Sequence, residues 1–407
     1  RICYRGLMII DNFTITLCCA VLVMALLTSV LANPFFRKFA AHKVGGTDVA
    51  NNENENDGCC STDNDGCCEN GPKVSVVIIS NGTDRQMDEH LPVYLTQDYA
   101  PGYEVVVVAV QGDSATEDVL KRYASNPNLY TTFVPGDSLF MSRAKLAVTI
   151  GVKAAHNDWV IVADSRYVPN SDEWIKAMAR GCGDDTDMVM GYTCYNEATQ
   201  SYKRFERLRE QAYLLRRAMR GAALCSRGAN LMFRKSQFIK EDGYRGNLQF
   251  IQGEYDFLLN KYAAEGTANV VTNADAWLVE DEPSATTWRN EHISFINYRS
   301  CLNGIASHRV LHIVDTLCLH LCYVACIAVA AIAALLQNWI VLGSAAAALV
   351  LALTVRTILA HKALTRFSTS IAAWKAPLME LRCFWSGLSC RLLYMKADKH
   401  EFTSHKL

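Results

Sequence analysis

The chain has 407 residues, 50% of them hydrophobic, and a formal net charge of -1. This length is enough for one large domain together with membrane segments. The balanced charge disfavours nucleic acid as a main partner, because phosphate binding requires a basic surplus. The 16 cysteines follow no regular framework, so we expect them to be mostly reduced, as in a cytosolic domain. Because the first residue is Arg1, we expect a start upstream of it or an atypical start codon.

Three long apolar runs predict membrane-spanning helices. Residues 13–32 carry no charge, and about 20 residues are needed to cross the hydrocarbon core. A signal peptide is the alternative, which the length of the run and the basic residues after it disfavour. Runs near 316–336 and 339–360 predict a helical hairpin, in which Arg356 lies near a helix end and can snorkel. A buried hairpin of a soluble protein is the other interpretation.

Lys and Arg follow the first run and recur beyond residue 360, whereas the turn between the last two runs is uncharged. Because cytoplasmic loops carry an excess of basic residues, the intervening domain and the tail are predicted to share the cytoplasmic side. Residues 365–394 alternate apolar and basic positions, which predicts helices lying in the membrane interface.

Residues 45–72 are rich in Gly, Asn, Asp and Glu, which predicts a flexible acidic linker. The adjacent pairs Cys59-Cys60 and Cys67-Cys68 leave a metal site as the alternative, although zinc sites usually have two residues between paired cysteines.

Between residues 73 and 290, β-branched runs alternate with helical segments. This alternation predicts an α/β domain with a mostly parallel sheet and helices on both faces. Because ligands of such sheets bind at the carboxyl ends of strands, we expect chemistry near Asp164-Ser165-Arg166. The long helix predicted at 201–224 has a basic face, which is expected to be solvated or to meet anionic lipid headgroups. Strands are predicted at 73–79, 104–110, 129–134, 159–163, 188–192 and 268–271, and helices at 88–95, 116–124, 143–155 and 201–224.

Five motifs follow one another from Val74 to Arg299. In this order they resemble a family-2 glycosyltransferase with the GT-A fold, a Rossmann-type α/β architecture, of the membrane-anchored bacterial type. The motifs are LPxxLxQDY from Leu91, SRAKxAxxxGxxAA from Ser142, DxxxxPxxxW from Asp164, GANLMFR from Gly228 and GExDxL from Gly253.

The resemblance implies inverting transfer of a sugar from a nucleotide-diphosphate donor to an acceptor hydroxyl. It also implies a polysaccharide or lipid-linked acceptor, contact with membrane lipid, and a role in envelope or surface polysaccharide or glycolipid synthesis. The expected location is the bacterial inner membrane, with the catalytic domain in the cytoplasm. Members of the family commonly hold a divalent metal, Mg or Mn, with an Asp-x-Asp motif, and use an Asp of the later acidic motif as the base.

At these positions the sequence departs from the family. Arg166 replaces the second Asp of the metal motif, and Arg offers Mg²⁺ no oxygen, so only Asp164 remains as a metal ligand and a bound metal is doubtful. Tyr255 stands at the expected base position, and the Asp at the end of the second strand is displaced to Asp113. The Gln-x-x-Arg-Trp motif of processive members is missing.

The predicted donor site holds Arg166, with Lys145 and Arg143 helping it to neutralise the leaving diphosphate in place of a metal. Asp113 and Asp164 are the acidic members of this site. Glu254 or Asp256 is the predicted general base, and Asn230 is a predicted acceptor contact. Each also has a structural interpretation, such as a solvated charge, a turn residue or a carboxylate at a helix N-terminus.

Two other functions remain open. One is a catalytically inactive relative that binds a nucleotide-sugar or partners an active transferase. The other is a membrane scaffold that keeps only the fold. The predicted organisation is a transmembrane helix at 1–36, the linker at 37–72, the GT-A-like domain at 73–300, a transmembrane hairpin at 301–362 and an amphipathic tail at 363–407.

Overall fold

The computed structural model describes residues 11–31, 33–36, 71–81, 83–136, 138, 140–263 and 266–403, with the backbone alone at 307–309. The paired cysteines of the predicted linker lie outside the described residues. The chain divides into two compact units, residues 1–38 with 305–386 and residues 39–304 with 387–407. This division falls within helix α13 (Ala376–Lys396).

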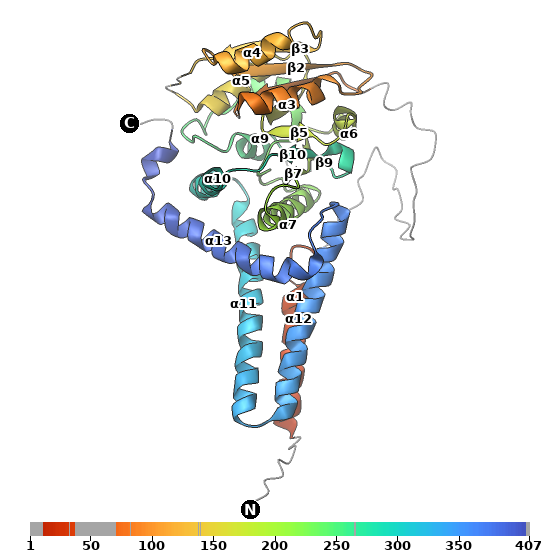
Figure 1. Cartoon of the computed structure of the whole chain (residues 1–407), viewed down its shortest axis with the longest axis vertical. Helices are drawn as coiled ribbons and strands as arrows, with labels where there is room; N and C mark the ends of the chain where they lie inside the picture. The colour runs from red at the N-terminus through yellow and green to blue at the C-terminus, as the bar shows by residue number, and fades with distance from the viewer. Residues whose placement is uncertain are drawn as a thin grey trace, which may run out of the picture. The chain divides into compact units, whose positions relative to one another are not determined.

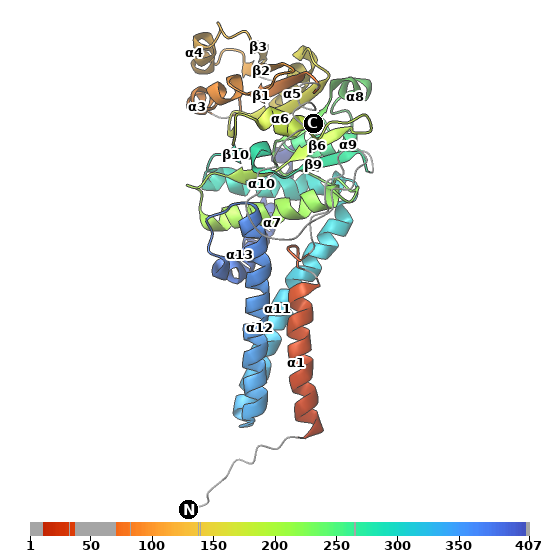
Figure 2. The same cartoon turned by 90° about the vertical axis from the view of Figure 1, so that its right-hand side faces the viewer.

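The first unit contains the predicted membrane segments. Within the described part of the chain, three helices are long and apolar enough to cross a membrane: α1 (Asn12–Val30), α11 (Ile305–Leu335, apolar from Val310) and α12 (Trp339–Arg366). They run side by side (Figures 1 and 2). Small side chains lie where they meet, which allows helix backbones to approach closely in lipid. These are Ala25, Cys322, Cys326, Ala348 and Ala352.

Arg356 does not snorkel to the surface as predicted. Its side chain is only 2% exposed, and its guanidinium donates to Glu380 on α13 (2.7 Å) and to Asp315 on α11 (3.3 Å). A third hydrogen bond of 3.2 Å reaches the carbonyl of Thr28 on α1. A buried charge is tolerated when it is paired and hydrogen-bonded, so Arg356 joins four helices instead of reaching out of the bundle.

The second unit is built on a mixed sheet, which confirms the predicted mostly parallel α/β architecture. Its strand order is β3-β2-β1-β4-β8-β6-β9, and β8 runs antiparallel to both of its neighbours while the other pairs are parallel. The strands are β1 (Val74–Ile79), β2 (Tyr103–Val110), β3 (Leu129–Val134), β4 (Trp159–Asp164), β6 (Met188–Gly191), β8 (Leu231–Arg234) and β9 (Ala268–Val271).

Helices cover both faces of this sheet. Figure 2 shows α3 and α4 on one side of β1–β3 and α5 on the other. A second, small sheet has the order β5-β10-β7. Its strands are β5 (Tyr167–Pro169), β7 (Thr193–Tyr195) and β10 (Leu278–Glu280), and the helices of the unit include α3 (Asp84–Leu95), α4 (Ser114–Arg122), α5 (Arg143–Ala154), α6 (Trp174–Ala179), α7 (Ser201–Ala218), α8 (Lys235–Lys240), α9 (Glu254–Tyr262) and α10 (Ala285–Tyr298).

Strand register brings the predicted site to one edge of the sheet. β1 lies between β2 and β4, and Ile79 at its carboxyl end pairs with Val108 on one side and Asp164 on the other. The segments that follow β1 and β4 therefore leave the sheet next to each other. A crevice outside the strand ends is where open α/β sheets bind ligands.

Helix α7 differs from its prediction in two ways. It ends at Ala218 rather than near residue 224, and its basic face is not solvated. Lys203 donates to the carbonyl of Pro283 (3.1 Å), and Arg207 pairs with Glu280 (2.7 Å), so both cations are buried. An apolar face opposite a basic face led us to expect the basic face in solvent, but a buried cation is stable once each donor has an acceptor.

We expect Gly151→Ala to destabilise the second unit. A methyl group there would overlap Val77 on β1 and approach Val108 on β2 to 2.8 Å, because α5 rests directly on these strands. Overpacking of this kind costs about 1–3 kcal/mol, which exceeds the gain of up to about 1 kcal/mol from replacing a helical glycine.

Thermal unfolding of the full chain in detergent, followed by tryptophan fluorescence, measures the change. Gly136→Ala is the matched control, because no atom lies within 4 Å of the added methyl group. Equal melting temperatures for the two variants would contradict the close approach of α5 to the sheet.

Candidate functional site

A cavity of about 730 Å³ opens in the second unit at the carboxyl ends of β1 and β4. Its walls come from the segment after β1, the N-terminus of α5, the segment after β4, the helices α7 and α10, and the start of α9. Residues 227–228 and 280–284 also contribute, so the cavity collects polar side chains from several parts of the chain. The ionisable side chains that line it include Arg143, Arg166, Glu206, Arg207, Glu254, Asp256, Glu280, Glu291 and His292.

Asp164 and Arg166 form a bidentate ion pair at the end of β4. The Oδ1 atom of Asp164 accepts from the backbone N (2.9 Å) and the Nε (3.2 Å) of Arg166, and its Oδ2 accepts from Nη2 (2.9 Å). The hydroxyl of Tyr255 donates to Oδ2 as well (3.2 Å). The Asp164 carboxylate is fully buried, so these contacts satisfy a group that water cannot reach.

Arg166 also ties the end of β4 to other walls of the cavity. Its Nη1 contacts Glu291 on α10 (2.8 Å) and lies 3.7 Å from Glu280 on β10. Glu280 in turn pairs with Arg207. Burial raises the pKa of Glu280 to about 7, with Arg207 opposing and Glu291 reinforcing the rise. Near neutral pH these carboxylates and the two arginines therefore nearly balance each other in charge.

The residues present do not fit the divalent metal that the resemblance implies. The described parts of the chain contain no group of three His, Cys, Asp or Glu side chains placed to hold a metal ion. Asp164, the remaining acidic position of the motif, already accepts hydrogen bonds on both oxygens. A hard cation such as Mg²⁺ needs free oxygen ligands, and Arg166 stands where one would be expected.

The three residues at the start of α9 differ sharply in their surroundings. Glu254 lines the cavity, and the hydrogen-bond donor that contacts its carboxylate is its own backbone N–H. Burial raises its pKa, which Arg166 partly opposes. Burial and the Asp164 charge hold the pKa of Tyr255 well above its usual range, so its hydroxyl remains a donor.

The carboxylate of Asp256 binds the backbone of the loop at residues 226–227. Its Oδ1 accepts from the backbone N–H groups of Ser226 (2.9 Å) and Arg227 (2.7 Å), and its Oδ2 accepts from the hydroxyl of Tyr298 (2.7 Å). Of the two predicted bases, the structure leaves only Glu254 with a carboxylate available to the cavity.

Besides the fully buried Asp164, three predicted site residues do not line the cavity. Asp113 caps α4 by accepting from the backbone N and hydroxyl of Thr116. Lys145 is fully buried and donates to the carbonyls of Asn247 (2.7 Å) and Phe250 (2.6 Å). Burial lowers its pKa to about 8, and Glu254 opposes this shift. Lys145 therefore supports the loop before α9 rather than being a solvated charge.

Asn230 is the third of these residues. Its side chain accepts from the indole of Trp174 (3.1 Å) and donates to the carbonyls of Tyr192 (2.9 Å) and Ala276 (2.8 Å). It is completely buried, with a φ of 73°. These bonds fasten β8 to its neighbours and leave no side-chain group for an acceptor.

Arg143 remains as a cation on the cavity wall. It is the first residue of α5, it is exposed, and it makes no ion pair with any described residue. Together with Arg166 it gives the strand-end side of the cavity two guanidinium groups.

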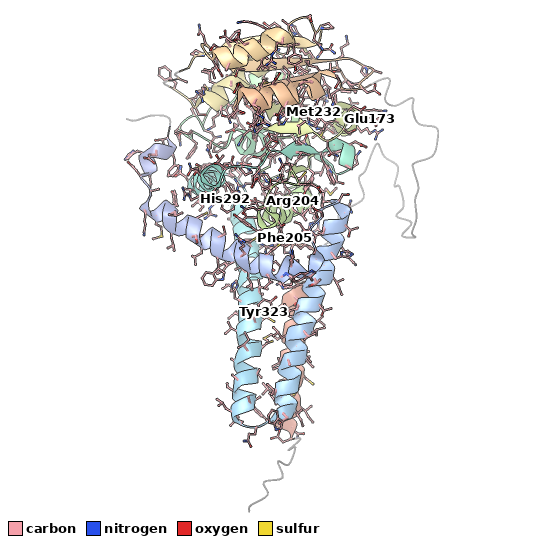
Figure 3. All side chains as sticks on the ribbon, in the orientation of Figure 1. Glu173, Arg204, Phe205, Met232, His292 and Tyr323 are labelled. Carbon is pink, nitrogen blue, oxygen red and sulfur yellow. The ribbon has the colours of Figure 1, made fainter. Side chains whose placement is uncertain are left out.

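Sequence reasoning missed the pair Glu206 and His292. Figure 3 labels His292 on α10 and the two residues that precede Glu206 on α7, Arg204 and Phe205, and Figure 2 shows the two helices running alongside each other. The His292 Nε2 lies 3.7 Å from the Glu206 Oε2. Burial, reinforced by Arg227, lowers the pKa of His292 to about 4. Burial, reinforced by Glu210, raises the pKa of Glu206 to about 8. The sequence carries no signal for this contact, because it joins two helices that are far apart in the chain.

Comparisons with known proteins give one family. Residues 72–276, half of the chain, match the family model described as Glycosyltransferase like family 2. No curated protein sequence matches the chain.

Solved structures with similarity include the mannosyltransferase PcManGT from Pyrobaculum calidifontis in complex with GDP-Man and Mn2+. It is 16% identical, with a TM-score of 0.48 and coverage of 94% of this chain and 99% of that one. S. aureus TarS 1-349 in complex with UDP-GlcNAc is 14% identical, with a TM-score of 0.40 and coverage of 77% and 92%.

We expect Glu206 to make stability fall as pH rises. Between the ordinary carboxyl pKa and about 8, the folded state keeps a proton on Glu206 that the unfolded chain has lost, so the free energy of unfolding decreases with pH. Each pH unit in this window costs about 1 kcal/mol.

Glu206→Gln replaces the titrating carboxyl group with a neutral amide, so it should flatten the decline of the free energy of unfolding with pH. Melting temperatures of the full chain and the variant between pH 5 and pH 8 measure the difference. Glu89→Gln, an exposed carboxyl on α3 outside the cavity, is the control. Parallel pH profiles for the wild type and Glu206→Gln would rule out a protonated Glu206.

Proposed function

The chain belongs to glycosyltransferase-like family 2, and we propose on this premise that its cavity transfers a sugar from a nucleotide-diphosphate donor to an acceptor hydroxyl. One observation carries the proposal. The available carboxylate of Glu254 lines the same cavity as the cations Arg143 and Arg166. A site for this reaction needs both a proton acceptor and a positive surface for the leaving diphosphate.

The diphosphate is assigned to the wall formed by Arg143, Arg166 and the residues after β1. This wall lies at the carboxyl ends of β1 and β4, where sheets of this kind bind nucleotides. As the bond to the sugar breaks, negative charge develops on the diphosphate oxygen, and guanidinium groups already held in place stabilise it without reorganising.

Glu254 is assigned the role of general base. The acceptor oxygen forms a bond to the anomeric carbon, the bond from that carbon to the diphosphate oxygen breaks, and the acceptor proton passes to Glu254. Attack opposite the leaving group inverts the anomeric centre. The raised pKa of Glu254, caused mainly by burial, makes it a stronger proton acceptor than an ordinary glutamate.

The acceptor is proposed to be a polysaccharide or lipid-linked molecule of a bacterial envelope, met at the cytoplasmic side of the inner membrane. Support comes from the three apolar helices and from the basic residues that flank them. Trp374, Leu378 and Trp385 are large and exposed near α13, as expected of a segment that contacts membrane lipid.

An inactive, nucleotide-sugar-binding relative is the second candidate. The hydrogen bonds that Asp164 and Asp256 accept favour this candidate, because they leave neither carboxylate available to react with a substrate. Such a protein would bind the donor without turning it over.

Glu254→Gln is expected to lower kcat by roughly 10²–10⁴-fold while donor binding stays unchanged, because general-base catalysis contributes about this much. Turnover of nucleotide-sugar by membranes containing the full chain gives kcat, and calorimetry gives donor affinity.

Asp256→Asn provides the contrast. The amide oxygen can still accept from the two backbone N–H groups, but the amide NH₂ then meets the hydroxyl of Tyr298 and the charge of the carboxylate is lost, so we expect a lower melting temperature. Full activity in Glu254→Gln would exclude Glu254 as the base, and donor binding without turnover in the wild type would favour the second candidate.

The orientation can be tested directly. A fluorescent protein fused after Leu407 should fluoresce, and alkaline phosphatase at the same position should stay inactive, because the tail is proposed to be cytoplasmic. Active phosphatase would place the tail, and the proposed reaction, on the opposite side.

A further inference from the structure

The Asp164 carboxylate has no acceptor position left for a metal ion. An ionised carboxylate offers about four lone-pair sites. Two contacts from Arg166 use Oδ1, and one contact each from Arg166 and Tyr255 uses Oδ2. A cation could bind only by displacing a bidentate guanidinium from a buried carboxylate.

We propose that Arg166 takes the place of a divalent cation and binds the donor's diphosphate directly, so that donor binding needs no metal ion. This inference rests on the proposed function, since it concerns the diphosphate of the same donor.

Arg166 still has donors to offer. A guanidinium carries five N–H groups. Two of them are used on Asp164 and one on Glu291, which leaves one on each terminal nitrogen. The side chain is 19% exposed and lines the cavity. Arg suits this role because its planar fork matches phosphate oxygens.

Asp164 fixes the guanidinium in position before the donor arrives. The ion pair is bidentate and its carboxylate is fully buried, so the cation does not have to be ordered on binding. A bound metal ion would supply the same two properties, a fixed position and a positive charge.

Arg143 adds a second positive charge on the same wall, and no described carboxylate neutralises it. Several carboxylates line the same cavity, and among those, Glu280 and Glu291 lie within 4 Å of the guanidinium of Arg166. The raised pKa of Glu280, caused by burial, reduces its charge near neutral pH. Glu291 competes with the diphosphate for the Nη1 of Arg166, so removal of its charge should favour the donor.

Calorimetry on the full chain in detergent provides the main test. UDP, GDP, ADP and dTDP are titrated in excess EDTA and again with saturating MnCl₂. We expect at least one nucleotide to bind, with a Kd that changes by less than about threefold between the two conditions. Binding that requires Mn²⁺ would overturn the inference and leave the proposed function standing. Binding of none of the four under either condition would overturn both.

Variants test the named residues. Arg143→Ala and Arg166→Lys are each expected to weaken nucleotide binding in EDTA by roughly tenfold to a hundredfold, the effect of losing a charged hydrogen bond. Glu291→Gln should tighten it. Arg85→Ala, an exposed arginine on α3 outside the cavity, is the matched control and should bind as the wild type does. Unchanged affinity in both Arg143→Ala and Arg166→Lys would overturn the inference.

Arg166→Asp gives a gain-of-function test. It frees Asp164 and places a second carboxylate two residues away, near Glu291, which creates the oxygen ligands that a metal needs. Nucleotide binding by this variant should be at least tenfold tighter with Mn²⁺ than with EDTA. Equal binding in both conditions, in a variant whose tryptophan fluorescence shows it to be folded, would count against Arg166 as the replacement for the cation.

Discussion

The ion pair between Asp164 and Arg166 is the interaction on which the site depends. Asp164 ends a central strand and is completely buried, so without a cation its charge would be very costly. Arg166 supplies that cation and also reaches Glu291 on α10, and Tyr255 closes the remaining side from α9. One buried carboxylate thus sets the relative positions of the sheet edge, the start of α9 and the middle of α10. These contacts hold the wall at which the diphosphate is proposed to bind.

Around this pair, acidic side chains divide into two kinds. Asp256 and Asp164 accept hydrogen bonds from several donors and act as structural anchors. Glu254 lines the cavity and accepts from its own backbone N–H, and its pKa is raised by burial. This difference in surroundings, rather than the position of each residue in a motif, separates a proton acceptor from a structural group.

The fold could be predicted further than the site. Buried β-branched runs such as Val74–Ile79 predict strands, and the alternation of strands with helices leaves few possible topologies for the sheet. The long apolar runs predict the membrane helices. The sequence could not show that Lys145 and Asn230 turn inward to bind backbone carbonyls, since the same residue types also bind ligands. Nor could it place Glu206 opposite His292, because their contact is made between two helices far apart in the sequence.

The buried Arg356 has a consequence for biosynthesis. Its partners Thr28 and Asp315 precede it in the chain, but Glu380 follows it. A ribosome therefore delivers the arginine to the insertion machinery before its strongest partner exists. Until the last helix is made, the guanidinium of Arg356 lacks its closest acceptor, so a chain truncated before Glu380 would be a natural substrate for membrane quality control.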